Sequence, residues 1–192
     1  MPEIVLFEQI ENKLIICFNR PEIRSPLSIT VLEKLHVLTE KMSTDKTIQV
    51  LIFTGTEDVF ASGADLREIA NVTGETATEF ALRGQRLMTK IAELSQTTIA
   101  AVNGFCFGGA LDLALACDKR IASTTAVFSH PGANLGIITG WGGTQRLPRL
   151  VGEAKALEMF LTAKRVDARE ALGIGLIDKI AENPLTESLA NF

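Results

Sequence analysis

Two short apolar runs, each followed by a glycine-containing turn and a helix, constrain the fold of this chain most strongly. The runs are "IQVLIFTG" at residues 48–55 and "TTIAAVNG" at residues 97–104. A continuous apolar run of this length, without alternating polar residues, is typical of a strand buried on both faces of a sheet. Because helical spacing follows each run, strands and helices alternate, and the sequence predicts an α/β fold.

The other segments fit the same class. A hairpin is predicted at residues 4–21, and a helix with Ser28 as its N-cap follows it. We expect a loop at residues 56–69 and further helices at about 75–94 and 109–118. Short strands are predicted at 119–124 and 126–130, and then a Gly-rich loop, helices and a final strand over 139–183. With 192 residues and no obvious linker or repeat, we expect one domain over residues 1–192.

Composition excludes several classes of function. A formal net charge of −4 gives no overall basic field for nucleic acid. No run reaches the ~20 apolar residues of a membrane span, and the first residues lack the pattern of a secretory signal, so we expect a cytoplasmic protein. Cys17, Cys106 and Cys117 lie in apolar runs without CxxC spacing. They predict reduced core thiols, and we expect no metal site.

The pair Gly108-Gly109 lies where the second buried run leads into a helix. The first backbone N–H groups of a helix have no intrahelical partner, and glycine lets a ligand approach them, so this turn suits developing negative charge on oxygen. Close packing of helix on strand explains the two glycines equally well. Ser62-Gly63-Ala64 form a similar turn after the first run, with Asp65 near the next helix start, and the two turns together favour a pair of backbone donors to one oxygen.

Five motifs, in this order, resemble the crotonase (enoyl-CoA hydratase/isomerase) superfamily over nearly the whole chain: "NRPE…LS", "FASGADLREI", "AAVNGFCFGGALDLALACDKRIAS", "LGIITGWGGTQRLPRLVG" and "A…A…GLID". The resemblance implies a crotonase-like spiral of ββα units that binds an acyl-CoA thioester. It implies that the backbone N–H groups of Ala64 and Gly109 form an oxyanion hole for the thioester carbonyl. Coenzyme A enters as part of the substrate, and no separate cofactor is expected. Substrate contacts are implied for Glu22, Ile23, Arg24, Ser62, Asp65, Leu66 and Gly108, and the CoA moiety is expected to follow the segments 20–28 and 60–65.

The sequence departs from the family at the positions that matter most for hydration. Hydratases of the family hold and activate water with two glutamates; the first aligns with Asp112, which is one methylene shorter, and the second aligns with Gly132. Ala110 replaces a further family glycine. His130 is the other proton carrier nearby, although Pro131 favours a structural or peripheral position for it. Trp141 lines an acyl pocket or packs in the core, and packing is the simpler interpretation.

These departures leave the reaction open. One carboxylate, Asp112, suits isomerisation better than hydration, and the second position, Gly132, is expected to limit hydration. Alternatives are another crotonase reaction, such as thioester hydrolysis or decarboxylation, and a non-catalytic acyl-CoA binder or assembly subunit. The resemblance implies a homotrimer or hexamer. Family members continue past the segment matching 175–192 into C-terminal helices, and most of that region is expected to be missing from residues 1–192.

Overall fold

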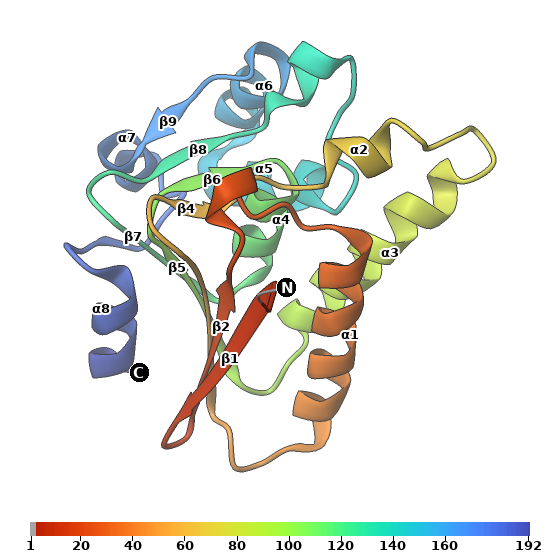
Figure 1. The fold of residues 1–192 in the computed structure, drawn as a ribbon. Helices are drawn as coiled ribbons and strands as arrows, with labels where there is room; N and C mark the ends of the chain where they lie inside the picture. The colour runs from red at the N-terminus through yellow and green to blue at the C-terminus, as the bar shows by residue number, and fades with distance from the viewer. Residues whose placement is uncertain (1–2) are drawn as a thin grey trace.

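The computed structural model describes residues 3–192 and builds them around two sheets (Figure 1). The larger sheet has the strand order β1-β2-β3-β5-β7-β10, with bounds β1 Val5–Ile10, β2 Lys13–Phe18, β3 Val50–Gly55, β5 Thr97–Val102, β7 Lys119–Ala122 and β10 Lys179–Ile180. The smaller sheet has the order β4-β6-β8-β9, with bounds β4 Val59–Ala61, β6 Phe105–Phe107, β8 Val127–Ser129 and β9 Val166–Asp167. The α/β class predicted from the alternating pattern is confirmed.

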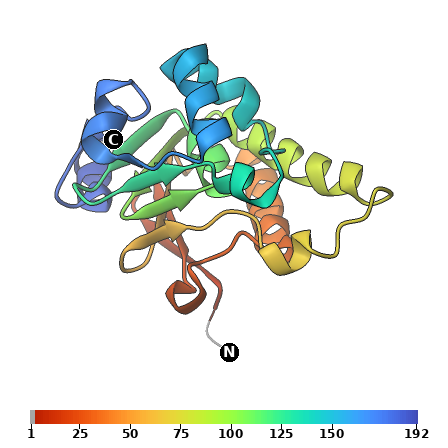
Figure 2. The same cartoon turned by 90° about the horizontal axis from the view of Figure 1, so that it is seen from above.

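The helices lie around these sheets, as the view from above also shows (Figure 2). The longer ones are α1 Ile29–Thr44, α3 Ala77–Ala92, α4 Gly109–Ala116, α5 Gly143–Val151, α6 Glu153–Thr162 and α8 Pro184–Asn191. The shorter ones are α2 Leu66–Ile69, α7 Ala168–Gly173 and the 3₁₀ helices Pro21–Ile23 (η1) and Pro131–Leu135 (η2). Ser28 caps α1 as predicted, because its side chain accepts a hydrogen bond from the Val31 N–H.

A repeated pair of strands connects the two sheets. A strand of the larger sheet leads into one of the smaller sheet in the pairs β3–β4, β5–β6 and β7–β8, and a helix follows each pair. This arrangement is the ββα spiral that the resemblance implied. The expectation of a loop at residues 56–69 was wrong in part, and so was the expectation that a helix directly follows the strand at 97–104. The strands missed there, β4 and β6, have only three residues each, which is too few to show a period in the sequence.

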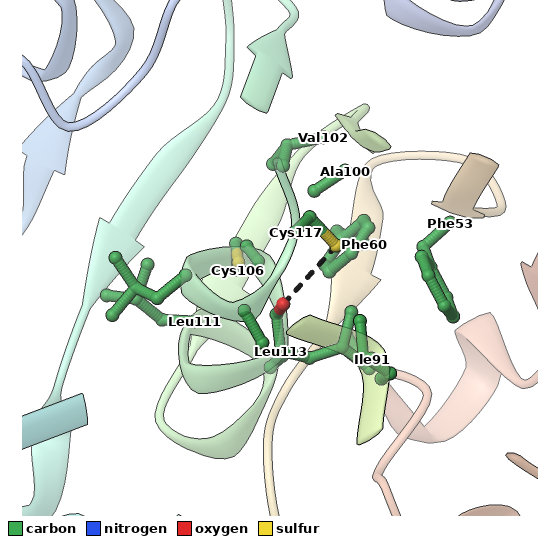
Figure 3. Packing of buried hydrophobic residues seen from close by; sticks show 14 of the residues in the cluster. Phe53, Phe60, Ile91, Ala100, Val102, Cys106, Leu111, Leu113 and Cys117 are labelled. Atoms are coloured by element: carbon green, nitrogen blue, oxygen red, sulfur yellow. Dashed lines mark hydrogen bonds between the residues drawn. The ribbon is translucent and has the colours of Figure 1, made fainter. Parts of the chain in front are cut away.

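Apolar side chains fill both faces of the larger sheet. Helices α1, α3 and α4 cover one face, where Phe53, Phe60 and Leu111 are fully buried (Figures 1 and 3). Helix α8 covers part of the other face with Leu185 and Leu189. Burial on both faces explains why the sequence of β3 and β5 is apolar without alternation.

The three cysteines are free thiols, as their apolar surroundings predicted. Cys106 and Cys117 are buried, and Cys17 is half-buried. Cys117 is the residue directly after helix α4, and its Sγ–H group donates to the carbonyl of Leu113 in that helix at 3.4 Å (Figure 3). Burial raises the pKa of the Cys117 thiol to about 12, so this group behaves as a core side chain and not as a nucleophile.

One buried cation joins the C-terminal part of the chain to the core. The Arg120 guanidinium donates to the carbonyls of Cys117 at 2.7 Å and Leu176 at 3.0 Å, and to the Asp178 carboxylate at 3.1 Å. Arg120 lies on β7 and is 6% exposed. It therefore supplies donors that the end of α4 and the segment before β10 need.

Replacing this side chain should destabilise the fold. Arg120→Ala leaves the Cys117 and Leu176 carbonyls without their donor, and we expect the free energy of unfolding to fall by about 3 kcal/mol. Urea unfolding followed by circular dichroism measures the change. Arg169→Ala, at an exposed position on α7, is the matched control and should change stability by less than about 0.5 kcal/mol. Equal effects of the two variants would contradict the role given to Arg120.

Candidate active site

A cavity of about 100 Å³ lies where the ends of β4, β6 and β8 meet. Its polar and backbone lining comes from Ser62, Ala64, Gly108, Gly109, Asp112, His130, Gly132, Thr139 and Gly140. Its apolar lining comes from Leu66, Ile69, Phe80, Pro131, Leu135, Ile137, Ile138 and Trp141. The fold therefore brings the two glycine turns, the acid of α4 and the segment around Gly132 to one place.

The two turns adjoin because the strands before them pair. β4 and β6 are parallel neighbours, so the turn after each strand emerges at the same edge of the smaller sheet. Gly63 has φ +92°, and a Cβ at this position would lie 2.6 Å from the Phe107 carbonyl oxygen and 2.8 Å from the Gly109 nitrogen. Only glycine allows the two backbones to come this close. The Gly63 carbonyl in turn accepts from the Leu27 N–H at 2.8 Å, which fixes the turn from its other side.

Two backbone donors at these turns have no partner of their own. Within residues 3–192, the N–H groups of Ala64 and Gly109 make no hydrogen bond to a backbone or side-chain acceptor, and both residues line the cavity. Gly109 is the first residue of α4, whose positive dipole end adds to the attraction for negative charge. This arrangement fits an oxyanion hole, whose function stays a prediction.

The glycine pair has a packing role as well. Gly108 has φ +54° and ψ −121°, a conformation that L side chains rarely adopt. A Cβ on Gly109 would lie 2.3 Å from the Trp141 ring. Trp141 is buried, with 3% exposure, and its ring lies 5.9 Å from that of Phe80. Trp141 both packs in the core and forms one wall of the cavity. The sequence left core packing and lining of a pocket as alternatives for this residue, and the structure is compatible with both.

Asp112 lies on the first turn of α4 and is 1% exposed. Its Oδ2 accepts a short hydrogen bond from the Thr139 hydroxyl. Its Oδ1 lies against Gly143, where an added Cβ would be 2.1 Å away. Burial raises the pKa of this carboxyl to about 7, although the bonds from Thr139 and the Trp141 backbone and the charge of Arg146 lower it. An acid with this pKa can exchange a proton near neutral pH.

His130 is the second titratable group in the cavity. Its Nε2 lies 3.6 Å from Asp112 Oδ1, and its ring packs on Phe160 at 5.0 Å between centroids. His130 lines the cavity and does not lie at its periphery, whereas a structural role for it remains compatible with its burial: it directly follows β8, at φ −109° and ψ 87°, and η2 begins only after it. Burial lowers the pKa of the imidazole to about 4, so His130 is neutral at pH 7 and the contact is not an ion pair there.

Gly132 lies in η2, on the wall of the same cavity. A Cβ here would lie 2.5 Å from the Ile137 carbonyl oxygen, and the Ile137 N–H donates to the Gly132 carbonyl at 3.0 Å. A glutamate at this position therefore cannot enter without moving the backbone of residues 132–137. The loop over residues 132–137 is therefore closed onto the glycine.

The other predicted contacts lie beside the cavity. Ser62 and exposed Leu66 line it, whereas Asp65 is buried as the N-cap of α2 and pairs with Arg67 at 2.6 Å. The segment containing Glu22, Ile23 and Arg24 is outside the cavity wall. It adjoins the Ser62 turn through the Ser62 N–H, which donates to the Ser25 carbonyl at 3.4 Å. Contact of these residues with a substrate stays a prediction.

Two functional candidates escaped prediction from the sequence. Thr139 bonds the Asp112 carboxylate, and Gly143 leaves room for that carboxylate. Thr139 lies on the loop after η2 and Gly143 is the first residue of α5, and neither a period nor a spacing of charged residues indicated contact with Asp112. No cluster of three or more His, Cys, Asp or Glu side chains that could hold a metal ion occurs in the described part of the chain.

The spiral of ββα units, with its cavity at the ends of the short strands, is the architecture of a crotonase-type protein. The sequence model of the enoyl-CoA hydratase/isomerase family matches residues 9–189. The chain is 38% identical to crotonyl-CoA hydratase of Syntrophomonas wolfei over 181 residues, which is 94% of this chain and 70% of that protein. It is 36% identical to short-chain-enoyl-CoA hydratase of Clostridium acetobutylicum over 179 residues, 93% of this chain and 69% of that protein.

Solved structures agree with this assignment. The crystal structure of enoyl-CoA hydratase from Bacillus anthracis superposes with a TM-score of 0.91 at 34% identity, covering 98% of this chain and 74% of that one. The chain therefore belongs to the enoyl-CoA hydratase/isomerase family of the crotonase superfamily, whose enzymes bind acyl-CoA thioesters. No helix among residues 3–192 is long and apolar enough to cross a membrane.

The raised pKa of Asp112 predicts a pH-dependent cost to stability. The folded-state value of about 7 lies above the ordinary value of about 3.9. Between these values the folded protein keeps a proton that the unfolded chain has lost, so ionising Asp112 lowers stability as the pH rises. Asp112→Asn should therefore gain stability relative to wild type from pH 4 to pH 7, by about 3 kcal/mol, and level off above pH 7. Urea unfolding at several pH values tests this; a difference independent of pH would contradict it.

The closed loop at Gly132 predicts that even a methyl group is costly there. Gly132→Ala places its Cβ against the Ile137 carbonyl, and we expect a loss of about 1–3 kcal/mol in the free energy of unfolding. Gly74→Ala is the matched control, because no atom lies within 4 Å of its added Cβ. Thermal and urea unfolding compare the two variants. Equal stabilities would show that the loop moves freely and reopen the position to a glutamate.

Proposed function

We propose that this chain binds an enoyl-CoA thioester, stabilises its enolate and moves a proton between carbons with Asp112. The observation that carries the proposal is a single buried carboxyl of pKa about 7 in the same cavity as the free N–H groups of Ala64 and Gly109. Such a group is half ionised near neutral pH, which is the condition a proton-transfer catalyst needs. The family membership supports the thioester as the substrate class.

The chemistry of an isomerisation follows from these three groups. The thioester carbonyl oxygen accepts hydrogen bonds from the Ala64 and Gly109 N–H groups. Ionised Asp112 removes a proton from C2 of a 3-enoyl-CoA, and the electron pair moves into the carbonyl to give the dienolate. Protonated Asp112 then returns the proton to C4 as the double bond forms between C2 and C3. The two amides stabilise the oxyanion, each by roughly 3–4 kcal/mol in oxyanion holes generally.

The surroundings of the cavity support an acyl-CoA ligand. The side chains of Leu66, Phe80, Ile137 and Trp141 offer apolar walls to an acyl chain. The CoA part would follow the adjoining segments of η1 and the Ser62 turn, where exposed Arg24 is available to its phosphates. Arg24 also lies 6.0 Å above the Phe105 ring, which holds it on this side of the molecule.

Other features of the family remain proposals for this chain. A homotrimer or hexamer is implied by the resemblance, and exposed leucines on α5 and α6 supply apolar surface for it: Leu150, Leu157 and Leu161. Light scattering measures the assembly. Location in the cytoplasm likewise stays a prediction.

Removing the charge of Asp112 separates catalysis from binding. Asp112→Asn keeps the shape of the side chain but cannot carry the proton, so we expect turnover of 3-enoyl-CoA to fall by about 10²–10⁴-fold. The dissociation constant of the CoA ester should change little, since the two amide donors are untouched. In the wild type, kcat should rise with pH through about 7, as the base ionises. Conversion is followed by mass spectrometry, and binding by calorimetry.

The matched control is Asp58→Asn, an exposed acid on the loop before β4. It should leave turnover unchanged. A wild type that binds CoA esters but converts none would instead favour a non-catalytic acyl-CoA binder. Release of free coenzyme A or of carbon dioxide would favour thioester hydrolysis or decarboxylation. Full activity of Asp112→Asn would place the proton transfer on another group.

A further inference from the structure

Three buried polar atoms in the cavity have no hydrogen-bond partner among residues 3–192. They are Oδ1 of Asp112 and both ring nitrogens of His130. The two side chains are 1% and 3% exposed, so solvent does not reach them freely. A buried polar group without a partner costs roughly 1–3 kcal/mol. A site that keeps three of them together is therefore built for a polar ligand.

The geometry around these atoms indicates what the ligand is. The distance of 3.6 Å between His130 Nε2 and Asp112 Oδ1 is too long for a direct hydrogen bond. Both atoms are buried, so a water that bridges them requires a small shift of one of the two side chains. Thr139 already occupies Oδ2, which leaves Oδ1 as the free acceptor. The cavity of about 100 Å³ exceeds the ~15 Å³ that one water requires.

The position of His130 follows from the local backbone. Gly132 brings no side chain to the cavity, and the Ile137 carbonyl closes on it. His130, two residues earlier, directly follows β8, and its ring packs on Phe160. The imidazole thereby enters the cavity two residues before the position where hydratases of this family carry their second glutamate.

We propose that Asp112 and His130 together hold the water that adds to a 2-enoyl-CoA, so that this chain is a hydratase in which a histidine supplies the second water contact. The inference rests on the proposed function, since it uses the same thioester site and the same two amide donors. It adds one catalytic residue, His130, and one reaction, hydration, to that site.

The step balances without any further reactant. The water oxygen forms a bond to C3, and the π electrons of the C2=C3 bond move toward the carbonyl held by Ala64 and Gly109. Ionised Asp112 takes one proton from the water, and neutral His130 keeps its hydrogen bond to the water oxygen or hydrogen. Protonated Asp112 then gives its proton to C2. The product is the 3-hydroxyacyl-CoA, and the enzyme is regenerated.

The test compares two reactions of one protein. Wild type is given a 2-enoyl-CoA, crotonyl-CoA, in H₂¹⁸O, and a 3-enoyl-CoA in ordinary buffer. We expect hydration with ¹⁸O at C3 in the first case and isomerisation in the second. His130→Phe should lower kcat for hydration by about 10²-fold or more while isomerisation by Asp112 falls less than about 5-fold. His130→Gln, which can still bond a water, should recover part of the hydration rate.

Two checks separate a loss of the imidazole nitrogens from a general disturbance of the site: a packing variant, and a measurement of folding and binding for every variant. Phe160→Leu disturbs the contact behind the imidazole without removing its nitrogens, and it should lower both reactions equally if it lowers either. Circular dichroism shows whether each variant is folded, and calorimetry shows whether it binds crotonyl-CoA. If His130→Phe fails either check, His130→Gln and His130→Asn are compared with wild type instead. An equal loss of both reactions in the folded histidine variants would overturn the role of His130.

The failures of the two proposals look different. A wild type that isomerises the 3-enoyl-CoA but incorporates no ¹⁸O from water overturns the present inference and leaves the proposed function intact. A wild type that binds these esters and performs neither reaction overturns both. Hydration that survives unchanged in His130→Phe shows that the water is held elsewhere, and it too overturns the inference.

Discussion

The backbone contact between the Gly63 turn and the start of α4 is the constraint on which the site depends. It requires β4 and β6 to pair in parallel, it requires glycine at 63, and it places two free N–H groups on one cavity wall. The larger sheet positions this contact, because its strands β3, β5 and β7 each lead directly into one short strand of the smaller sheet. The mostly apolar core is thus the scaffold for a site whose oxygen-binding donors are backbone groups.

Much of this architecture could be predicted from the sequence. The buried runs at β3 and β5, the hairpin and the capped helix α1 all carry local signals that depend on burial or capping alone. Of the smaller sheet, only β8 was found in this way, as the strand predicted at 126–130. Its strands have two or three residues, so their state is decided by pairing with segments far along the chain. The site residues also divide into those with a local sequence signal and those without one. Ala64, Gly109 and Asp112 belong to recognisable motifs, whereas Thr139 and Gly143 contact Asp112 only through tertiary packing.

Gly132 and His130 show where reasoning from aligned positions reaches its limit. A glycine in the place of a glutamate suggests a lost function and an empty space. The structure has no such space, because the Ile137 carbonyl lies against the glycine. It has instead a buried imidazole that the neighbouring proline made improbable as a site residue. Proline disfavours helical backbone in the residue before it, and His130, at φ −109° and ψ 87°, lies outside the helical region directly before η2.

Desolvation of Asp112 and His130 destabilises the fold, and the same desolvation shifts their pKa values in the direction that suits proton transfer. Desolvation raises the pKa of the carboxyl to about 7 and lowers that of the imidazole to about 4, so near pH 7 the imidazole is neutral and the carboxyl is partly protonated. A solvated pair would instead be a carboxylate and a partly protonated ring at this pH. The apolar helix α4 and the Phe160 ring remove that solvation. The same low-dielectric surroundings strengthen the attraction of the Ala64 and Gly109 amides for an oxyanion, because a hydrogen bond away from water is electrostatically stronger.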